Sequence, residues 1–271
     1  MRILFCGDVV SRAGRQAILE KIPELKQQLK LDCVIVNVDN AANGFGVTKK
    51  ICDEFTKAGV DVLTGGDHIW DQKETLSFIS NYPTLLRPLN FPEQTPGNGM
   101  RVHTTSLGQK ILVVHLMAQV FMKYSLDCPF ACMENVLKRH RLQGTADVII
   151  VDFHGEASSE KMAMGHFLDG RVSLVVGTHT HVPTADTMVL PKGTAYQTDA
   201  GMCGDYHSVI GFDTSAPLKH FVQKMKLERL TPAQENYTLC GVYLETDDRT
   251  GLAKKVTPIR VGATLSQAIP A

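Results

Sequence analysis

Two histidines stand one residue apart in the stretch VVGTHTH (residues 175–181), directly after an apolar run. Alternate residues of an extended chain point to the same side, so His179 and His181 can converge on one point. Imidazole is a common ligand of transition metals, which makes a shared metal ion one interpretation. The other is a polar pair at the end of a strand, and an H-x-H motif alone does not decide between them.

Carboxylate, amide and imidazole side chains also stand at or just after the ends of other apolar runs. They are Asp8, Asp39, Asn40, Asp67, His68 and His154. In an α/β sheet, the carboxyl ends of the strands form the edge where ligands bind. Each residue alone is weak evidence. Together with the two histidines they make eight metal- or proton-competent residues at strand ends, and this indicates one shared site.

Short apolar runs predict the strands that deliver these residues. The runs lie at residues 2–6, 33–38, 60–65, 110–116, 146–153 and 172–177. We expect a helix from Ser11, as its N-cap, to about Leu29, with a kink or a break at Pro23. Thr48 is expected to cap a second helix that runs to about residue 58. The alternation of strands and helices is typical of an α/β protein.

The last third of the chain has a different pattern. Residues 194–202, 237–246 and 251–261 predict strands without long helices between them. Residues 117–143 predict a small helical lobe over the sheet. Because the chain contains no recognisable linker or repeat, we expect residues 1–271 to form a single domain with this lobe inside it.

Composition excludes several classes of function. Lys and Arg together number 28, and so do Asp and Glu, so the net charge is zero. The lack of excess positive charge argues against a long nucleic acid as a partner. Every apolar run is shorter than the roughly 18 residues that span a membrane. The seven cysteines are scattered and odd in number, which favours reduced thiols in a cytoplasmic protein over a disulfide framework.

The strand-end residues are suited to metal chemistry at phosphorus. Carboxylates, an amide and three imidazoles suit borderline divalent ions such as Mn, Fe, Co, Ni or Zn. The set is too large for one tetrahedral zinc, whereas two ions bridged by a carboxylate and a hydroxide would use all of it. Two metals about 3.5–4 Å apart are the usual device for displacing an oxygen at phosphorus. A histidine outside the coordination shell would then be free to protonate the leaving oxygen.

Several motifs resemble those of a known superfamily. GDVV, GDH, GTHTH and the lone strand-end His154 resemble the calcineurin-like metallophosphoesterases. The longer strings DNAANGFGVT, DFHGEASSEK, GTHTHVPTAD, GTAYQTDAGMCG and SVIGF are similar to the bacterial YmdB-like phosphodiesterases, and the resemblance covers nearly the whole chain. It implies a four-layer α/β/β/α sandwich with a dinuclear metal site. It also implies hydrolysis of cyclic nucleotides or similar small phosphodiesters, with a metal-bridging hydroxide as nucleophile and a histidine as general acid.

The resemblance also implies a role for each strand-end residue. The implied metal ligands are Asp8, Asp39, Asn40, Asp67, His154, His179 and His181. Asp8 and His181 would share one metal, and Asp39 would bridge the pair. Asn40 would also lie near the substrate, and His68 matches the general acid, which contacts the substrate. Asp186 is a candidate to orient a ligand histidine, with a surface turn as the equal alternative.

Two positions depart from the pattern of the family. The pattern has glutamate where this chain has Asp39 and asparagine where it has Asp67. With Asp67, three carboxylates and a bridging hydroxide would cancel the charge of two divalent ions. One trivalent iron would restore a positive charge, so we expect two transition-metal ions, iron or manganese, with zinc as the alternative.

Two classes of function remain as hypotheses. An intact His68 and a full ligand set favour an enzyme, a phosphodiesterase that acts on a small phosphodiester or cyclic nucleotide. The departures at Asp39 and Asp67 keep a second hypothesis open, a signalling or scaffold protein that retains the metal site with weak turnover. The sequence leaves open whether copies of the chain form a homo-oligomer.

Overall fold

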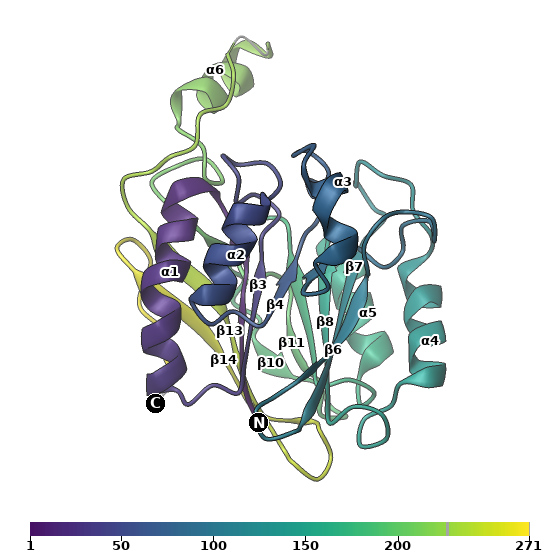
Figure 1. Cartoon of the computed structure of the whole chain (residues 1–271). Helices are drawn as coiled ribbons and strands as arrows, with labels where there is room; N and C mark the ends of the chain where they lie inside the picture. Colours follow the sequence, from purple (N-terminus) through teal and green to yellow (C-terminus); the bar gives the residue numbers. More distant parts are fainter. Residues whose placement is uncertain (226–227, 271) are drawn as a thin grey trace.

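The computed structural model describes residues 1–225 and 228–270, and it contains two six-stranded sheets that face each other (Figure 1). The strands of the first sheet, in spatial order, are β14 (Ala253–Gly262), β13 (Thr238–Thr246), β1 (Arg2–Cys6), β3 (Cys33–Asn37), β4 (Val62–Thr64) and β5 (Leu85–Leu86). Those of the second are β10 (Met188–Val189), β11 (Ala195–Gln197), β9 (Leu174–Thr178), β8 (Val148–His154), β7 (Lys110–Met117) and β6 (Met100–Thr104). β2 (Asp8–Val9) and β12 (Met202–Cys203) form a separate parallel pair.

Each sheet has a parallel centre. In the first sheet β1, β3, β4 and β5 are parallel, and in the second β7, β8, β9 and β11 are. Antiparallel strands complete both sheets, with β13 beside β1, β14 beside β13, β6 beside β7 and β10 beside β11. The six strands expected from apolar runs are all present. The strand ends that carry the polar residues are therefore the carboxyl ends of parallel strands, where a shared site is favoured.

Helices cover the two outer faces, so the layers follow the expected order α/β/β/α (Figure 1). The helices are α1 (Ser11–Gln28), α2 (Lys49–Lys57), α3 (Thr75–Phe78), the 3-10 helix η1 (Ile79–Asn81), α4 (Pro129–Arg139), α5 (Ser158–Leu168) and α6 (Ser215–Gln223). α1 and α2 pack on the first sheet, and α4 and α5 pack on the second. Within the described residues, no helix is both long and apolar enough to cross a membrane.

The strand β1 illustrates why the central strands are apolar at every position. Leu4 and Cys6 pack in the cluster that faces α1 and α2, whereas Ile3 and Phe5 pack in the cluster between the two sheets. Alternate residues of a strand point to opposite faces, and here both faces are covered. A continuous apolar run is therefore the pattern that this layer requires.

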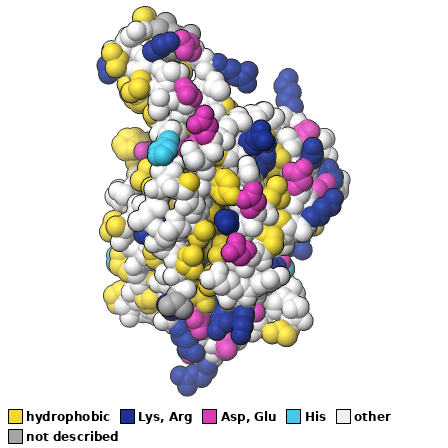
Figure 2. Space-filling view, turned by 90° about the vertical axis from the view of Figure 1, so that its left-hand side faces the viewer, with side chains coloured by type: hydrophobic (Ala, Val, Ile, Leu, Met, Phe, Trp, Pro, Cys, Tyr) yellow, Lys and Arg dark blue, Asp and Glu magenta, His cyan; other side chains and the backbone are white. Residues whose placement is uncertain are grey.

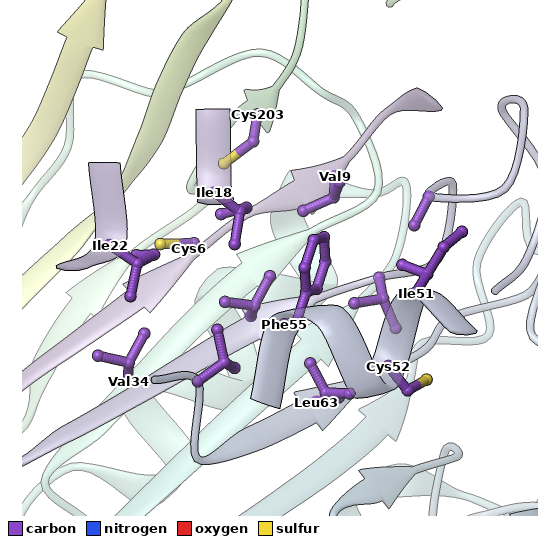
Figure 3. Packing of buried hydrophobic residues seen from close by; sticks show 14 of the residues in the cluster. Cys6, Val9, Ile18, Ile22, Val34, Ile51, Cys52, Phe55, Leu63 and Cys203 are labelled. Atoms are coloured by element: carbon purple, nitrogen blue, oxygen red, sulfur yellow. The ribbon is translucent and has the colours of Figure 1, made fainter. Parts of the chain in front are cut away.

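Helix and sheet side chains interlock in the outer layer. Figure 3 shows Phe55 of α2 and Ile18 of α1 close to Val34 and Leu63 of the first sheet. All four side chains have at most 1% of their surface exposed. This packing fixes the helices against the sheet and, with them, the loops at the carboxyl ends of the strands.

The N-cap predicted for α1 was wrong, α1 is not divided at Pro23, and the N-cap predicted for α2 is confirmed. Val10, not Ser11, occupies the N-cap of α1, because Ser11 has a φ of 53° instead of the extended backbone of an N-cap. Pro23 does not divide the helix, since it lies on the exposed face, where water can bind the carbonyl that it leaves without a donor. Thr48 caps α2, with its Oγ1 accepting from the N–H of Ile51 at 3.4 Å.

The stretch 117–143, expected as a helical lobe, contains one helix. α4 packs in the outer layer through Met133, Val136 and Leu137, and residues 118–128 form turns and irregular chain. This helix is part of the layer over the second sheet.

The helix α6 stands apart from the four layers (Figure 1). It projects beyond the sandwich, and hydrophobic side chains are visible on the projection at the top of Figure 2. Phe221 and Val222 of α6 are 62% and 78% exposed. The chain reaches α6 directly after Phe212, close to the site described next.

Candidate metal centre

The structure brings all eight predicted residues to one edge of the sandwich. They follow the ends of β1, β3, β4 and β9 or, for His154, close β8, and they are Asp8, Asp39, Asn40, Asp67, His68, His154, His179 and His181. The two sheets supply residues to the same place because their parallel strands end at the same side of the molecule. The structure thus gathers the eight residues in one place, and their binding of a shared ligand stays a prediction.

His154 lies at the centre of one group of ligand atoms. Its Nε2 is 3.2 Å from Oδ1 of Asp67, 3.2 Å from Nδ1 of His179 and 3.5 Å from Oδ2 of Asp39. Its ring is fully buried. Gly66 passes so close that a Cβ there would stand 2.1 Å from this nitrogen, so the loop accepts only glycine.

A buried hydrogen-bond chain fixes the tautomer of His154. Its Nδ1 is 2.9 Å from Oγ1 of Thr178, and that hydroxyl donates to Oδ1 of Asp152 at 2.8 Å. Since the threonine proton is committed to Asp152, Nδ1 of His154 must be the donor to Thr178. The Nε2 atom therefore carries a lone pair, and this lone pair points at the Asp67 carboxylate.

Asp152 is held in turn by both sheets. Thr64 Oγ1 donates to its Oδ2 at 2.6 Å, and Asn37 Nδ2 does so at 3.1 Å. Nδ1 of His115 lies 3.1 Å from the same oxygen. These residues come from β3, β4, β7 and β8, so the orientation of His154 depends on the docking of the two sheets.

In His181 and Asn40, as in His154 and Asp67, the lone pair of a histidine nitrogen faces an acceptor oxygen. Nδ1 of His181 donates to the carbonyl of Ile210 at 2.8 Å, which leaves a lone pair on Nε2. Asn40 Nδ2 donates to the carbonyl of Gly44 at 2.9 Å, which turns Oδ1 toward His181. The Nε2 and Oδ1 atoms are 3.2 Å apart. Two acceptors thus face each other, an arrangement that a cation between them would stabilise.

The backbone around His179 and His181 has unusual geometry. Their φ angles are 99° and 67°, in the left-handed region that non-glycine residues rarely adopt. The N–H of His179 donates to Oδ2 of Asp8 at 3.0 Å. Oδ1 of Asp8 is buried and has no hydrogen-bond partner among the described residues. A buried carboxylate oxygen of this kind is costly unless a cation binds it.

Burial shifts the pKa values of the ligand residues. Burial, with the charge of Asp199, raises the pKa of Asp8 to about 8. Burial and two neighbouring carboxylates raise the pKa of Asp39 well above its usual range. Burial lowers the pKa of His154 to about 3 and that of His181 to about 4. The two imidazoles are therefore neutral at pH 7, the form that binds metals, and the carboxyl groups of Asp8 and Asp39 ionise fully only beside a positive charge.

The donor set therefore fits transition-metal ions. Two groups of atoms converge within 4.8 Å, one formed by Asp67, His154 and His179 and the other by Asp39, Asp67 and His68. The lone pairs that face each other and the partnerless oxygen of Asp8 are the observations that decide the fit. Nitrogen and carboxylate ligands in this number suit borderline divalent ions.

His68 lies beside this cluster with a partner of its own. Its Nδ1 is 2.7 Å from Oδ2 of Asp71, and its Nε2 is 3.9 Å from Oδ2 of Asp67. About a quarter of its side chain is exposed. The ring lines a cavity of about 260 Å³ together with Asn40 and His181. His68 is therefore oriented by one carboxylate and open to a molecule that enters the cavity.

Comparison with known proteins agrees with the motifs. The model of the family described as "YmdB-like protein" matches residues 4–259. The chain belongs to this YmdB-like family. It is 43% identical over 261 residues to the 2',3'-cyclic-nucleotide 2'-phosphodiesterase of Bacillus subtilis (strain 168), covering 96% of this chain and 97% of that relative.

Two crystal structures are similar to this YmdB-like chain. A hypothetical protein from Thermus thermophilus has a TM-score of 0.90 and 38% identity, with 97% of this chain and 100% of that one covered. A protein described as a novel phosphatase, from Mycoplasma pneumoniae, has a TM-score of 0.89 and 35% identity, with coverage of 97% and 93%. The similar structures thus agree with the fold described above.

Sequence reasoning missed the residues that support the YmdB-like site. Asp71 and Asp152 orient two of its histidines, and Asp199 holds the loop after β9. Asp186, considered from the sequence for such a role, accepts instead from the N–H of Thr198 at 3.2 Å and from its hydroxyl. The signal that could have found two of them is an acidic residue in or beside an apolar strand. Asp152 in DFHGEASSEK lies inside β8, and Asp199 in GTAYQTDAGMCG follows β11.

Proposed function

We propose that this protein is a metal-dependent phosphodiesterase that hydrolyses 2',3'-cyclic nucleotides or similar small phosphodiesters. The observation that carries the proposal is the pair of facing acceptors, Nε2 of His181 and Oδ1 of Asn40, at 3.2 Å. They belong to a cluster of three carboxylates and three imidazoles that lies beside a cavity, which His179 and His181 line. The Bacillus subtilis relative, named as a 2',3'-cyclic-nucleotide 2'-phosphodiesterase, supports the substrate class.

Two ions are proposed because the ligand atoms form two groups. Asn40, His181 and the partnerless oxygen of Asp8 would hold one ion. Asp67, His154 and His179 would hold the other, and they lie within 4.8 Å of one another. Asp39 would bridge the two. With three carboxylates in the set, the negative charge favours iron or manganese, with zinc as the alternative.

The residues of the chain would divide the work of hydrolysis. Bound there, the two ions would polarise the phosphoryl oxygens and make water a nucleophile at neutral pH. His68 would donate the proton of its Nε2 to the leaving oxygen, because Asp71 accepts from Nδ1 and turns Nε2 toward the cluster. Asn40 and His68 both line the cavity and would contact the substrate there.

We place the enzyme in the cytoplasm on the state of its thiols. All seven cysteines lie in the described part of the chain and are free, and five of them are buried. Free thiols in this number are usual where the cell keeps cysteine reduced. The cavity of about 260 Å³ suits a small substrate better than a long nucleic acid.

Metal analysis and an esterase assay on the same preparation test the proposal. Elemental analysis is expected to find two transition-metal ions per chain, and His154→Ala and His181→Ala should each reduce that number. His166→Ala is the matched control, since His166 is an exposed histidine of α5. The metal-loaded protein should hydrolyse 2',3'-cyclic AMP. Absence of metal in every preparation contradicts the site, and full metal with no hydrolysis favours a signalling or scaffold protein.

A further inference from the structure

The cavity beside the histidines has two chemically different walls. Asn40, His68 and His179 form a polar wall, and Phe45, Ile210 and Phe212 form an apolar one. The proposed function uses only the polar wall. The apolar wall comes from the NGFG and SVIGF motifs, whose backbone carbonyls orient Asn40 and His181 but whose apolar side chains have no task in the hydrolysis of a phosphodiester bond.

The aromatic side chains of the apolar wall pack against each other, and Phe45 also packs against His68. The ring of Phe45 lies edge-on to His68, with centroids 5.1 Å apart, and at 5.5 Å from the ring of Phe212. A Cβ at Gly44 would come within 2.7 Å of Phe212, so the glycine makes room for this packing. Phe212 is only 5% exposed and supports Phe45, which remains partly accessible at the cavity.

Ile210 is held in a strained and exposed position. Its φ of 49° is in the left-handed region, where a β-branched residue is a rare outlier. Its side chain is 51% exposed at the cavity, while its carbonyl accepts from His181. The turn is locked by the hydrogen bonds between Val209 and Phe212 at 2.8 and 3.0 Å. Strain that the surrounding structure maintains in this way is concentrated at functional sites.

We propose that Phe45 and Ile210 bind the nucleobase of a mononucleotide whose phosphodiester lies at the adjacent histidines. This inference rests on the proposed phosphodiesterase function and specifies its substrate. Base stacking on an aromatic side chain tolerates any of the bases, because every base has a π face. The cavity, at about 260 Å³, is near the small end of ligand sites and suits one nucleotide. The enzyme therefore selects for the presence of a base and discriminates weakly among bases.

A pair of substrates that share the reacting group tests this subsite. The metal-loaded enzyme is assayed with 2',3'-cyclic AMP and with glycerol 1,2-cyclic phosphate, which has the same five-membered phosphodiester and no base. The kcat/KM for 2',3'-cyclic AMP divided by that for glycerol 1,2-cyclic phosphate should fall about tenfold in Phe45→Leu, since stacking is lost while apolar volume remains. Ile210→Gly should lower the same ratio, because glycine keeps the positive φ and the carbonyl but removes the side chain. Leu107→Gly, at an exposed turn, is the matched control and should leave the ratio unchanged.

A binding measurement separates failure of the subsite from failure of the proposed function. Calorimetry should show that adenosine 3'-monophosphate binds the metal-loaded protein more tightly than inorganic phosphate, and that Phe45→Leu removes most of the difference. If the native enzyme hydrolyses neither ester, the proposed function fails, and the binding difference alone decides the subsite. Equal affinity for the two ligands, or a substrate ratio that neither substitution changes, overturns the inference.

Discussion

A short hydrogen bond of 2.7 Å joins Nδ1 of His68 to Asp71, three residues later. The two residues lie in one turn after β4, so a single local segment supplies the proposed proton donor and the carboxylate that orients it. Asp67, in the same segment, contacts His154 through Oδ1, and its Oδ2 lies 3.9 Å from Nε2 of His68. The roles proposed for residues 67 and 68 therefore differ by their partners, because Asp67 contacts a buried histidine whereas His68 contacts Asp71 and lines the cavity.

Substitution of His68 tests its role as the proton donor. His68→Ala should lower kcat by about 10²–10⁴-fold, the usual contribution of a general acid, while both metals remain bound. The loss should be largest for the alkoxide leaving group of a cyclic nucleotide and smallest for nitrophenolate, which needs no proton. Steady-state kinetics and elemental analysis measure both effects. Loss of a metal from His68→Ala would show that the roles of residues 67 and 68 are reversed.

The charge of Asp67 allows a second test. Asp67→Asn removes one of three carboxylates, so metal should bind more weakly, by about tenfold or more, because charges interact strongly in a partly desolvated site. With metal in excess, the lower negative charge should improve the apparent affinity for the anionic substrate. Metal titration and KM measure the two effects. Unchanged values for both would mean that the aspartate is equivalent to asparagine here.

The sequence was sufficient to predict which residues gather at the strand ends, but not the partners that orient them. Asp8 and His179 could be found because strand ends in an α/β sheet share one edge. Asp152 and the Ile210 carbonyl could not be found in this way. One is buried inside a strand, and the other is a backbone atom whose position depends on a turn locked by tertiary contacts.

At the scale of elements, one buried ion pair holds the loop that follows β9. Lys161 of α5 donates from Nζ to the carbonyl of Thr178 at 2.8 Å and to Oδ2 of Asp199 at 2.9 Å. Asp199 also accepts from the N–H and the hydroxyl of Thr180, at 3.1 and 2.8 Å. Thr180 lies between the two histidines with positive φ, so this network maintains their strained backbone.

Breaking that ion pair should affect stability and metal binding together. Lys161→Met leaves Asp199 buried without its cation, which is expected to cost about 3–5 kcal/mol in the free energy of unfolding. Metal affinity should also fall, because the loop that carries His179 loses a support. Denaturant unfolding and metal titration measure these changes. Lys49→Met, which breaks an exposed ion pair with Asp53, is the control and should change neither the free energy of unfolding nor the metal affinity. If the two variants behave alike, the ion pair of Lys161 and Asp199 does not support the loop.

Strands that form a continuous apolar run could be predicted from the sequence, and strands of two residues could not. β1 and β8 appear in the sequence as apolar runs because both of their faces are buried. β2 and β12 have two residues each, and they exist because the chain around the site brings them together. The start of α1 depends on the same contacts, since Ser11 N–H donates to the carbonyl of Asn40 at 2.9 Å.

At the scale of the whole molecule, the site places several ionisable groups where water does not reach. Asp8, Asp152 and Asp199 are all fully buried. Asp152 and Asp199 each have several donors, whereas Asp8 retains an oxygen without a partner among the described residues. Without metal, the fold therefore carries an electrostatic cost that is concentrated at Asp8 and its neighbours.

The pH dependence of the metal-free protein should reveal this cost. The pKa of Asp8 rises from 3.8 to about 8 on folding, so the folded state holds a proton that the unfolded state has released. Between these values, stability falls as pH rises, by up to about 1.4 kcal/mol per pH unit from this group. Asp8→Asn removes the effect, so its advantage over the native chain, both free of metal, should grow from pH 4 to pH 8. Unfolding curves at several pH values measure it, and a constant difference would contradict the assignment.

The contact between Asp8 and the backbone of His179 joins residues 171 positions apart, and this separation determines when in folding the site can form. Contacts between such distant positions form late, because a long segment of chain must first lose its conformational freedom. An ion therefore cannot nucleate the fold. We expect newly made chain to reach the sandwich without metal and to recruit its ions afterwards. The supply of metal in the cell would then raise the stability of the finished molecule by mass action and leave the rate at which it forms unchanged.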